Sequence, residues 1–128
     1  MYHNDKYNVE IKICLDNGIY EFDNNSATGK TRLCKELKEL QKLNEPVIGY
    51  TYGDDKLGID LSKVIEIVKP KVVLLDRYDM YNNMFHDEMI EWAKDSIVLI
   101  DCKDFLDIDY DTGWCDIEMS PEKIEVVQ

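Results

Sequence analysis

Apolar and polar residues alternate near the start of the chain. The alternation over residues 9–15 has the period of a half-buried β-strand, and a second alternating run covers residues 19–23. Asn17-Gly18 lies between the two runs and is a strong signal for a two-residue turn. We therefore expect a β-hairpin over residues 7–23, in which the facing apolar pairs are Leu15 with Tyr20 and Ile13 with Phe22.

Three later segments have the apolar spacing of amphipathic helices. The first covers residues 30–43, with an apolar stripe formed by Leu33, Cys34, Leu37 and Leu40. The second begins near Asp60 or Ser62, either of which can cap it, and ends before Pro70. The third covers roughly residues 85–94.

The segments between these helices predict strands. Residues 47–52 form a short apolar run that Gly53-Asp54-Asp55 is expected to break. Residues 71–76 and 96–101 are apolar without alternation, which is typical of strands covered on both faces of a parallel sheet. Residues 114–119 and 123–127 indicate a second hairpin, closed by Ser120-Pro121-Glu122.

The order of these elements predicts an α/β protein with a single domain over residues 1–128. We expect a three-layer sandwich whose sheet is mostly parallel, with an N-terminal and a C-terminal β-hairpin attached to it. No apolar run approaches the roughly 20 residues of a membrane span, and the first residues do not have the pattern of a signal peptide. A cytoplasmic protein is therefore expected.

The net charge of −12 narrows the choice of partners. After position 100 the chain has nine acidic residues and two lysines, a local charge of −7. Such a surface repels nucleic acid, so we expect no direct binding to DNA or RNA. The same charge favours a basic protein partner, which would bind the acidic C-terminal face.

Four cysteines are present, and none is part of a C-x-x-C pair. We expect reduced and mostly buried thiols. A zinc site formed by Cys102, Cys115 and either His3 or His86 is an alternative, although the spacing does not favour it.

Residues 24–31, Asn-Asn-Ser-Ala-Thr-Gly-Lys-Thr, end like the phosphate-binding motif G-x-x-x-x-G-K-[ST]. Asn24 replaces the first glycine of that motif. The residues expected to contact a nucleotide are Asn24, Ser26, Thr28, Gly29, Lys30 and Thr31. Two of the apolar strands end in aspartates, Asp76 and Asp101, at the sheet edge where ligands of open α/β folds bind.

On these motifs the chain resembles the P-loop NTPases over residues 19–101. The resemblance implies that Gly29 and Lys30 contact phosphate, and that Thr31 and Asp76 hold Mg²⁺ with ATP or GTP. Arg77-Tyr78-Asp79 stands where many ATPases have a glutamate that activates water, so Asp79 is the candidate base. Asn24, the absent glutamate and the polar Glu21 in the strand before the motif together predict weak hydrolysis or none.

Two functions are compatible with the sequence. In the first, the chain is a small nucleotide-binding protein of P-loop fold with weak or no hydrolysis. In the second, it is an acidic binding protein that blocks a basic, nucleic-acid-binding partner without catalysis. In size and charge, but not in any motif, this second function is similar to phage-type inhibitors such as anti-CRISPR proteins.

Overall fold

The structure, a computed structural model, describes residues 1–6, 8–22, 27–81, 84–102 and 112–128, with Ala27 and Thr28 described by their backbone only. In this part of the chain, eight strands and four α-helices confirm the expected α/β class. The strands are β1 (Tyr2–Asn4), β2 (Val9–Cys14), β3 (Gly18–Phe22), β4 (Val47–Tyr50), β5 (Val72–Leu75), β6 (Ile97–Ile100), β7 (Gly113–Ser120) and β8 (Lys123–Val127). The helices are α1 (Ala27–Lys42), α2 (Tyr52–Lys56), α3 (Leu61–Val68) and α4 (His86–Trp92), and a 3₁₀ turn, η1, covers Tyr78–Met80.

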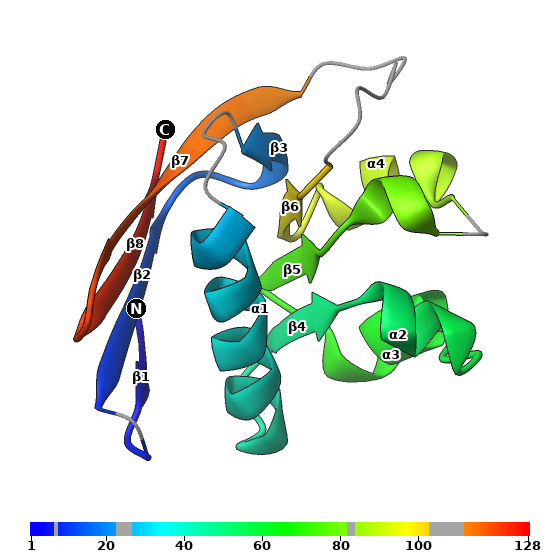
Figure 1. Ribbon diagram of the computed structural model, residues 1–128. Helices are drawn as coiled ribbons and strands as arrows, with labels where there is room; N and C mark the ends of the chain where they lie inside the picture. Colours follow the sequence, from blue (N-terminus) through cyan, green and yellow to red (C-terminus); the bar gives the residue numbers. More distant parts are fainter. Residues whose placement is uncertain (7, 23–26, 82–83, 103–111) are drawn as a thin grey trace.

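All eight strands belong to one sheet, in the order β1-β2-β8-β7-β3-β6-β5-β4 (Figure 1). Strands β7, β3, β6, β5 and β4 run parallel to one another, and β2 runs parallel to β8. The described antiparallel pairs are β1 with β2 and β7 with β8. The sheet is therefore mixed and mostly parallel.

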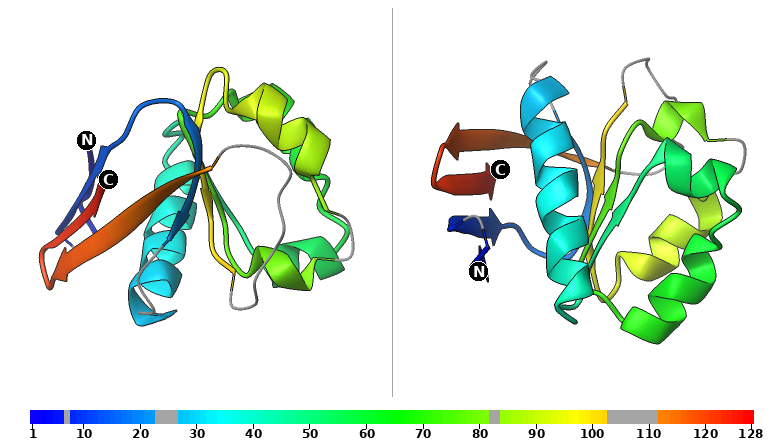
Figure 2. Two further views of the ribbon diagram at one scale, coloured as in Figure 1. Left: turned by 90° about the horizontal axis from the view of Figure 1, so that it is seen from above. Right: turned by 60° about the horizontal axis from the view of Figure 1, so that its bottom comes forward.

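The sheet curls around α1. In both views of Figure 2, α1 has strands β1, β2, β7 and β8 on one side and the parallel strands β3 to β6 on the other. Helices α2, α3 and α4 cover the opposite face of the parallel strands. Strands β3 to β6 thus form the middle of three layers, whereas in the described part of the chain β1, β2, β7 and β8 have a helix on their inner side only.

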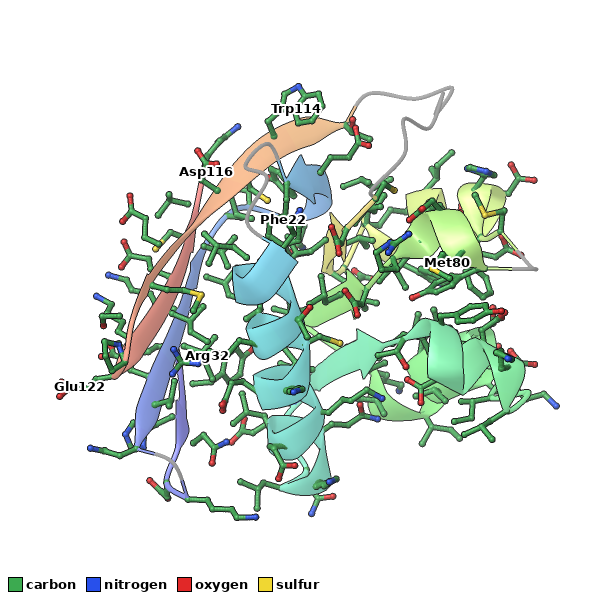
Figure 3. All side chains as sticks on the ribbon, viewed as in Figure 1. Phe22, Arg32, Met80, Trp114, Asp116 and Glu122 are labelled. Atoms are coloured by element: carbon green, nitrogen blue, oxygen red, sulfur yellow. The ribbon has the colours of Figure 1, made fainter. Side chains whose placement is uncertain are left out.

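Helix α1 contacts the C-terminal hairpin as well as the parallel strands. The guanidinium of Arg32 donates hydrogen bonds to the carbonyl oxygens of Ser120 and Pro121, at 3.1 and 2.9 Å. Figure 3 shows Arg32 pointing from α1 toward the curled strands. Because Ser120 pairs with Lys123, the turn of this hairpin consists of Pro121 and Glu122. The predicted C-terminal hairpin is confirmed.

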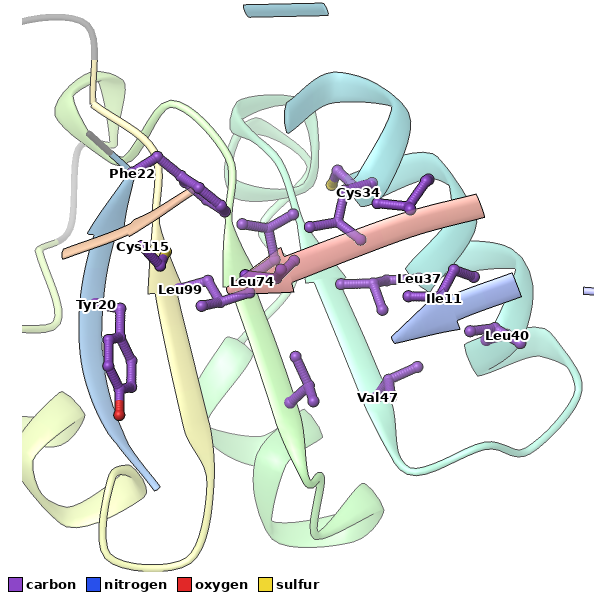
Figure 4. Close-up of a cluster of buried hydrophobic side chains, with 14 of the residues drawn as sticks. Ile11, Tyr20, Phe22, Cys34, Leu37, Leu40, Val47, Leu74, Leu99 and Cys115 are labelled. Carbon is purple, nitrogen blue, oxygen red and sulfur yellow. The ribbon is translucent and has the colours of Figure 1, made fainter. Parts of the chain in front are cut away.

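The expected apolar stripe of α1 forms the centre of the first core cluster (Figure 4). Leu33 and Leu37 are fully buried, and Cys34 and Leu40 are almost so. Burying a leucine contributes about 1.5–3 kcal/mol, so this stripe is a large part of what holds α1 in the curl. The helix begins at Ala27, three residues earlier than the predicted start at residue 30.

A second core cluster lies on the other face of the parallel strands. It contains a group of aromatic rings in edge-to-face contact, with Tyr50 and Tyr81 at 5.5 Å and Tyr78 and Tyr81 at 5.5 Å between ring centroids. Such geometry suits the ring quadrupoles. Helices α3 and α4 follow the predicted segments, and Asp60 caps α3 as expected.

The predicted N-terminal hairpin over residues 7–23 is wrong. Strands β2 and β3 do form, but β8 and β7 lie between them in the sheet. The turn residues bond elsewhere: the Gly18 N–H donates to the carbonyl of Ser96, and the Asn17 amide donates to the carbonyl of Lys94. Although Asn17-Gly18 favours a turn, β2 and β3 do not pair with each other, because the C-terminal hairpin supplies a strand partner for each of them.

Two elements were not predicted from the sequence. Strand β1 pairs with β2 and is too short to show a period. Helix α2 begins where Gly53-Asp54-Asp55 was expected to break the chain. Thr51 and Asp54 form a capping box, in which each side chain accepts a hydrogen bond from the other residue's backbone N–H. The T-x-x-D spacing was the signal for this helix.

The longest helix in the described part of the chain, α1, has 16 residues. No described helix combines the length and the apolar character that a membrane span requires.

Candidate functional site

The carboxyl ends of β5 and β6 meet the first turn of α1. Leu75 pairs with Ile100 in the sheet, so the residues that follow them, Asp76 and Asp101, lie side by side. Strand β3 is the other neighbour of β6, and α1 follows β3 in the chain. This topology brings Lys30, Asp76 and Asp101 to one edge of the sheet.

Lys30 forms a buried ion pair with Asp101. The Lys30 Nζ atom lies 3.0 Å from Asp101 Oδ1, and each side chain is 9% exposed. Lys30 is buried because it precedes Leu33 and Cys34 on the inner stripe of α1. Its Nζ is also 6.0 Å from the centroid of the Phe22 ring. A buried charge needs such compensation, since removing water from either ion costs several kcal/mol.

Asp76 and Asp101 form a carboxyl pair. Burial raises the pKa of Asp76, and a hydrogen bond to Asp101 and the negative charge of Asp101 raise it further. Arg77 and Lys30 oppose these effects, and the resulting pKa of Asp76 is about 6. At neutral pH Asp76 is mostly ionised, and in mild acid it takes up a proton.

Asp79 lies on the 3₁₀ turn after β5, where it pairs with Arg77. Arg77 Nε and Nη2 donate to the two carboxylate oxygens of Asp79, at 3.2 and 3.1 Å. The Asp79 side chain is 6% exposed. A water molecule that donates its proton to Asp79 would share the carboxylate oxygens with Arg77. Asp79 as the base stays a prediction.

The predicted loop residues have different outcomes. Asn24 and Ser26 lie outside the described residues. Thr28 and Gly29 belong to the first turn of α1, and Gly29 is buried. Thr31, the other predicted Mg²⁺ ligand, follows Lys30 in that turn and is exposed. The described residues contain no group of three or more side chains that would hold a metal by themselves.

Tyrosines fix the backbone around Asp76. The Tyr81 hydroxyl lies 2.7 Å from the carbonyl oxygen of Asp76 and 2.8 Å from that of Tyr50. Burial raises the pKa of Tyr81, so this hydroxyl remains a donor. Tyr78 is fully buried and accepts a hydrogen bond from the Phe85 N–H at 2.8 Å. These aromatic residues support the site from the core.

The alternative zinc set is not brought together. Cys115 is buried in the core cluster around α1, whereas Cys102 packs against the cluster on the other face of the sheet. His3 lies 2.7 Å from an Asp5 oxygen, and His86 is in edge-to-face contact with Tyr78. Burial and neighbouring acids raise the pKa of Cys102 to about 12, so it is a neutral thiol.

Asp101 is the functional candidate to which the sequence assigned no role. Its position after a buried strand predicted where it lies, but the neighbouring order of β3, β6 and β5 could not be read from the sequence. That order places Asp101, and not Asp76, against Lys30.

Known proteins supply no family for this chain: no family model matches it, and no significant match was found among curated proteins or solved structures.

Proposed function

We propose that this chain binds ATP or GTP together with Mg²⁺ at the edge formed by Lys30, Asp76 and Asp101, and hydrolyses the nucleotide weakly or not at all. The observation that carries the proposal is the buried Lys30–Asp101 pair beside Asp76, at the carboxyl ends of parallel strands. A relationship to the P-loop NTPases is part of the same proposal. It is supported by the succession of β3, the Gly29-Lys30-Thr31 turn of α1, and β5 followed by Asp76.

The chemistry of these groups suits a nucleoside triphosphate. The N-terminus of a helix as long as α1 carries the positive end of the helix dipole, which favours phosphate. Lys30 adds a full positive charge in the first turn of α1. Hydroxyl and carboxylate oxygens are ligands that Mg²⁺ prefers, and Thr31 and Asp76 would supply them. When bound, Mg²⁺ would neutralise part of the phosphate charge.

The Lys30–Asp101 pair sets a condition for binding. Lys30 can contact a phosphate only if it gives up or shares its contact with Asp101. The free energy of the pair is then subtracted from the free energy of nucleotide binding, so we expect weak affinity. The guanidinium of Arg77 competes with water for the carboxylate of Asp79, which is the reason for the expected slow hydrolysis.

A thermal-shift experiment with Mg-ATP and Mg-GTP tests this proposal. A ligand at 100 times its Kd stabilises the folded state by about 2.7 kcal/mol, which is a rise of several degrees in Tm for a domain of this size. We expect the rise in the wild type and in Lys35→Ala, a control on an exposed position of α1, and its loss in Lys30→Ala. The proposal fails if millimolar nucleotide leaves the wild-type Tm unchanged.

A further inference from the structure

The outer face of the curled strands carries an exposed tryptophan among acidic side chains. Trp114 begins this face on β7 and is 55% exposed, although tryptophan is usually one of the most buried residues of a protein. Asp116 and Glu118 follow it at every second position of the same strand. We call these three residues the β7 ladder; Figure 3 labels Trp114 and Asp116 on the strand.

The alternation of β7 fixes the direction of the ladder. Cys115 and Ile117 alternate with the ladder residues along β7. Cys115 belongs to the core cluster around α1, and Ile117 packs against that cluster. The side chains of the ladder therefore point away from α1. No helix of the described chain covers this side of β7, β8 and β2 in any of the ribbon views (Figures 1 and 2).

Acidic residues on neighbouring strands extend the ladder. In the sheet register Glu21 of β3 is opposite Trp114, and Glu125 of β8 is opposite Glu118. Two like charges facing each other across an antiparallel pair destabilise it. Lys123 lies 3.1 Å from Glu125, whereas Glu118 makes no ion pair within the described part of the chain. Lys12 of β2 is opposite Glu125 on the same face, so the acidic side chains Glu10, Asp116, Glu118 and Glu125 outnumber the two lysines, Lys12 and Lys123.

From this surface we infer that the β7 ladder binds an extended, basic segment of a partner protein, with arginine or lysine at alternate positions. Ladder residues are about 7 Å apart, because a strand rises about 3.4 Å per residue, and alternate side chains of an extended peptide have the same spacing. A guanidinium stacks on an indole ring and forms paired hydrogen bonds with a carboxylate. The net charge of −12 attracts such a segment and repels nucleic acid. The inference goes beyond nucleotide binding and does not depend on it.

Fluorescence anisotropy of a labelled peptide, Arg-Thr-Arg-Thr-Arg with blocked ends, tests the inference on the full chain. We expect saturable binding to the wild type that weakens at least about tenfold between 50 and 500 mM salt, where the Debye length shortens from about 14 to 4 Å. The rearranged peptide Thr-Arg-Arg-Arg-Thr has the same charge without the alternation, and we expect it to bind at least about fivefold more weakly.

Variants assign the binding to the ladder. We expect Trp114→Ala and the double variant Asp116→Asn/Glu118→Gln to weaken binding of the alternating peptide by about tenfold or more, a change of about 1.4 kcal/mol. Glu66→Gln/Glu88→Gln removes the same charge from exposed helix positions and should change the Kd less than about twofold. Lys30→Met should leave peptide binding unchanged, which separates this surface from the nucleotide site.

The inference is overturned if the wild type does not bind the alternating peptide at low salt. It is equally overturned if both peptides bind alike, or if the helix control loses as much affinity as the ladder variant. Circular dichroism of each variant, and of the buried-site variant Lys30→Met in particular, verifies that the fold is retained.

Discussion

The carboxyl group of Asp76 makes the stability of this protein depend on pH. Its pKa is raised to about 6, whereas an aspartate in an unfolded chain titrates near 3.9. The folded state therefore binds more protons than the unfolded state between about pH 4 and pH 6. It follows that Asp76 stabilises the fold most in acid, and that this contribution is lost as the pH rises through 6.

Replacing Asp76 with asparagine isolates this effect, because asparagine keeps a hydrogen-bond donor for Asp101 as protonated Asp76 does. Between pH 4.5 and pH 7, we expect the free energy of unfolding of the wild type to fall by about 1–2 kcal/mol more than that of Asp76→Asn. This value is smaller than the full pKa shift would give, because Asp76 is partly exposed to solvent. Urea titrations at several pH values measure the difference. Parallel pH profiles of the two proteins would contradict a raised pKa.

The contact between α1 and β4 depends on a glycine. A Cβ added at Gly49 would lie 2.8 Å from the carbonyl oxygen of Cys34 and 3.2 Å from its Sγ, so helix and strand would have to separate. We expect Gly49→Ala to destabilise the fold by about 2 kcal/mol or more. The measurement is a denaturant titration.

Gly53, four residues further, provides the matched control. It lies in α2, and a Cβ there meets only Thr51 Oγ1, at an ordinary 3.5 Å. Alanine loses less conformational entropy than glycine on entering a helix, so Gly53→Ala should be neutral or stabilise by up to about 1 kcal/mol. If both variants lose the same stability, the close approach at Gly49 is not the cause.

The elements were predictable where their signal is local. The stripe from Leu33 to Leu40 predicted α1, and the unbroken apolar runs before Asp76 and Asp101 predicted β5 and β6. The C-terminal hairpin was predicted because its turn and its pairing are adjacent in the sequence. The N-terminal hairpin failed for the opposite reason: the partners of β2 and β3 come from the C-terminus, about 100 residues away.

At the scale of the whole molecule, the order of the strands in the sheet creates the candidate site. This order could not be predicted from the sequence. Strand β6 lies between β3 and β5, so Asp101 stands between Lys30 and Asp76. The motif in residues 24–31 predicted that Lys30 belongs to the site. The position of Asp76 and Asp101 after apolar strands predicted that the site lies at the carboxyl edge of the sheet. The partner that holds Lys30 became known from the structure alone.

In the proposed function, Lys30 exchanges Asp101 for a phosphate when nucleotide binds. Removing the competing charge should then strengthen binding. Asp101→Asn keeps the shape of the side chain and one acceptor oxygen, but it leaves the positive charge of Lys30 to the ligand. Lys30→Met keeps most of the apolar stem and removes the charge.

Titration calorimetry with Mg-ATP tests this exchange most directly. We expect Asp101→Asn to bind about tenfold more tightly than the wild type, a gain of about 1.4 kcal/mol, and Lys30→Met to show no measurable binding. If Asp101→Asn binds no better than the wild type, or if Lys30→Met binds as well as the wild type, Lys30 does not exchange Asp101 for phosphate.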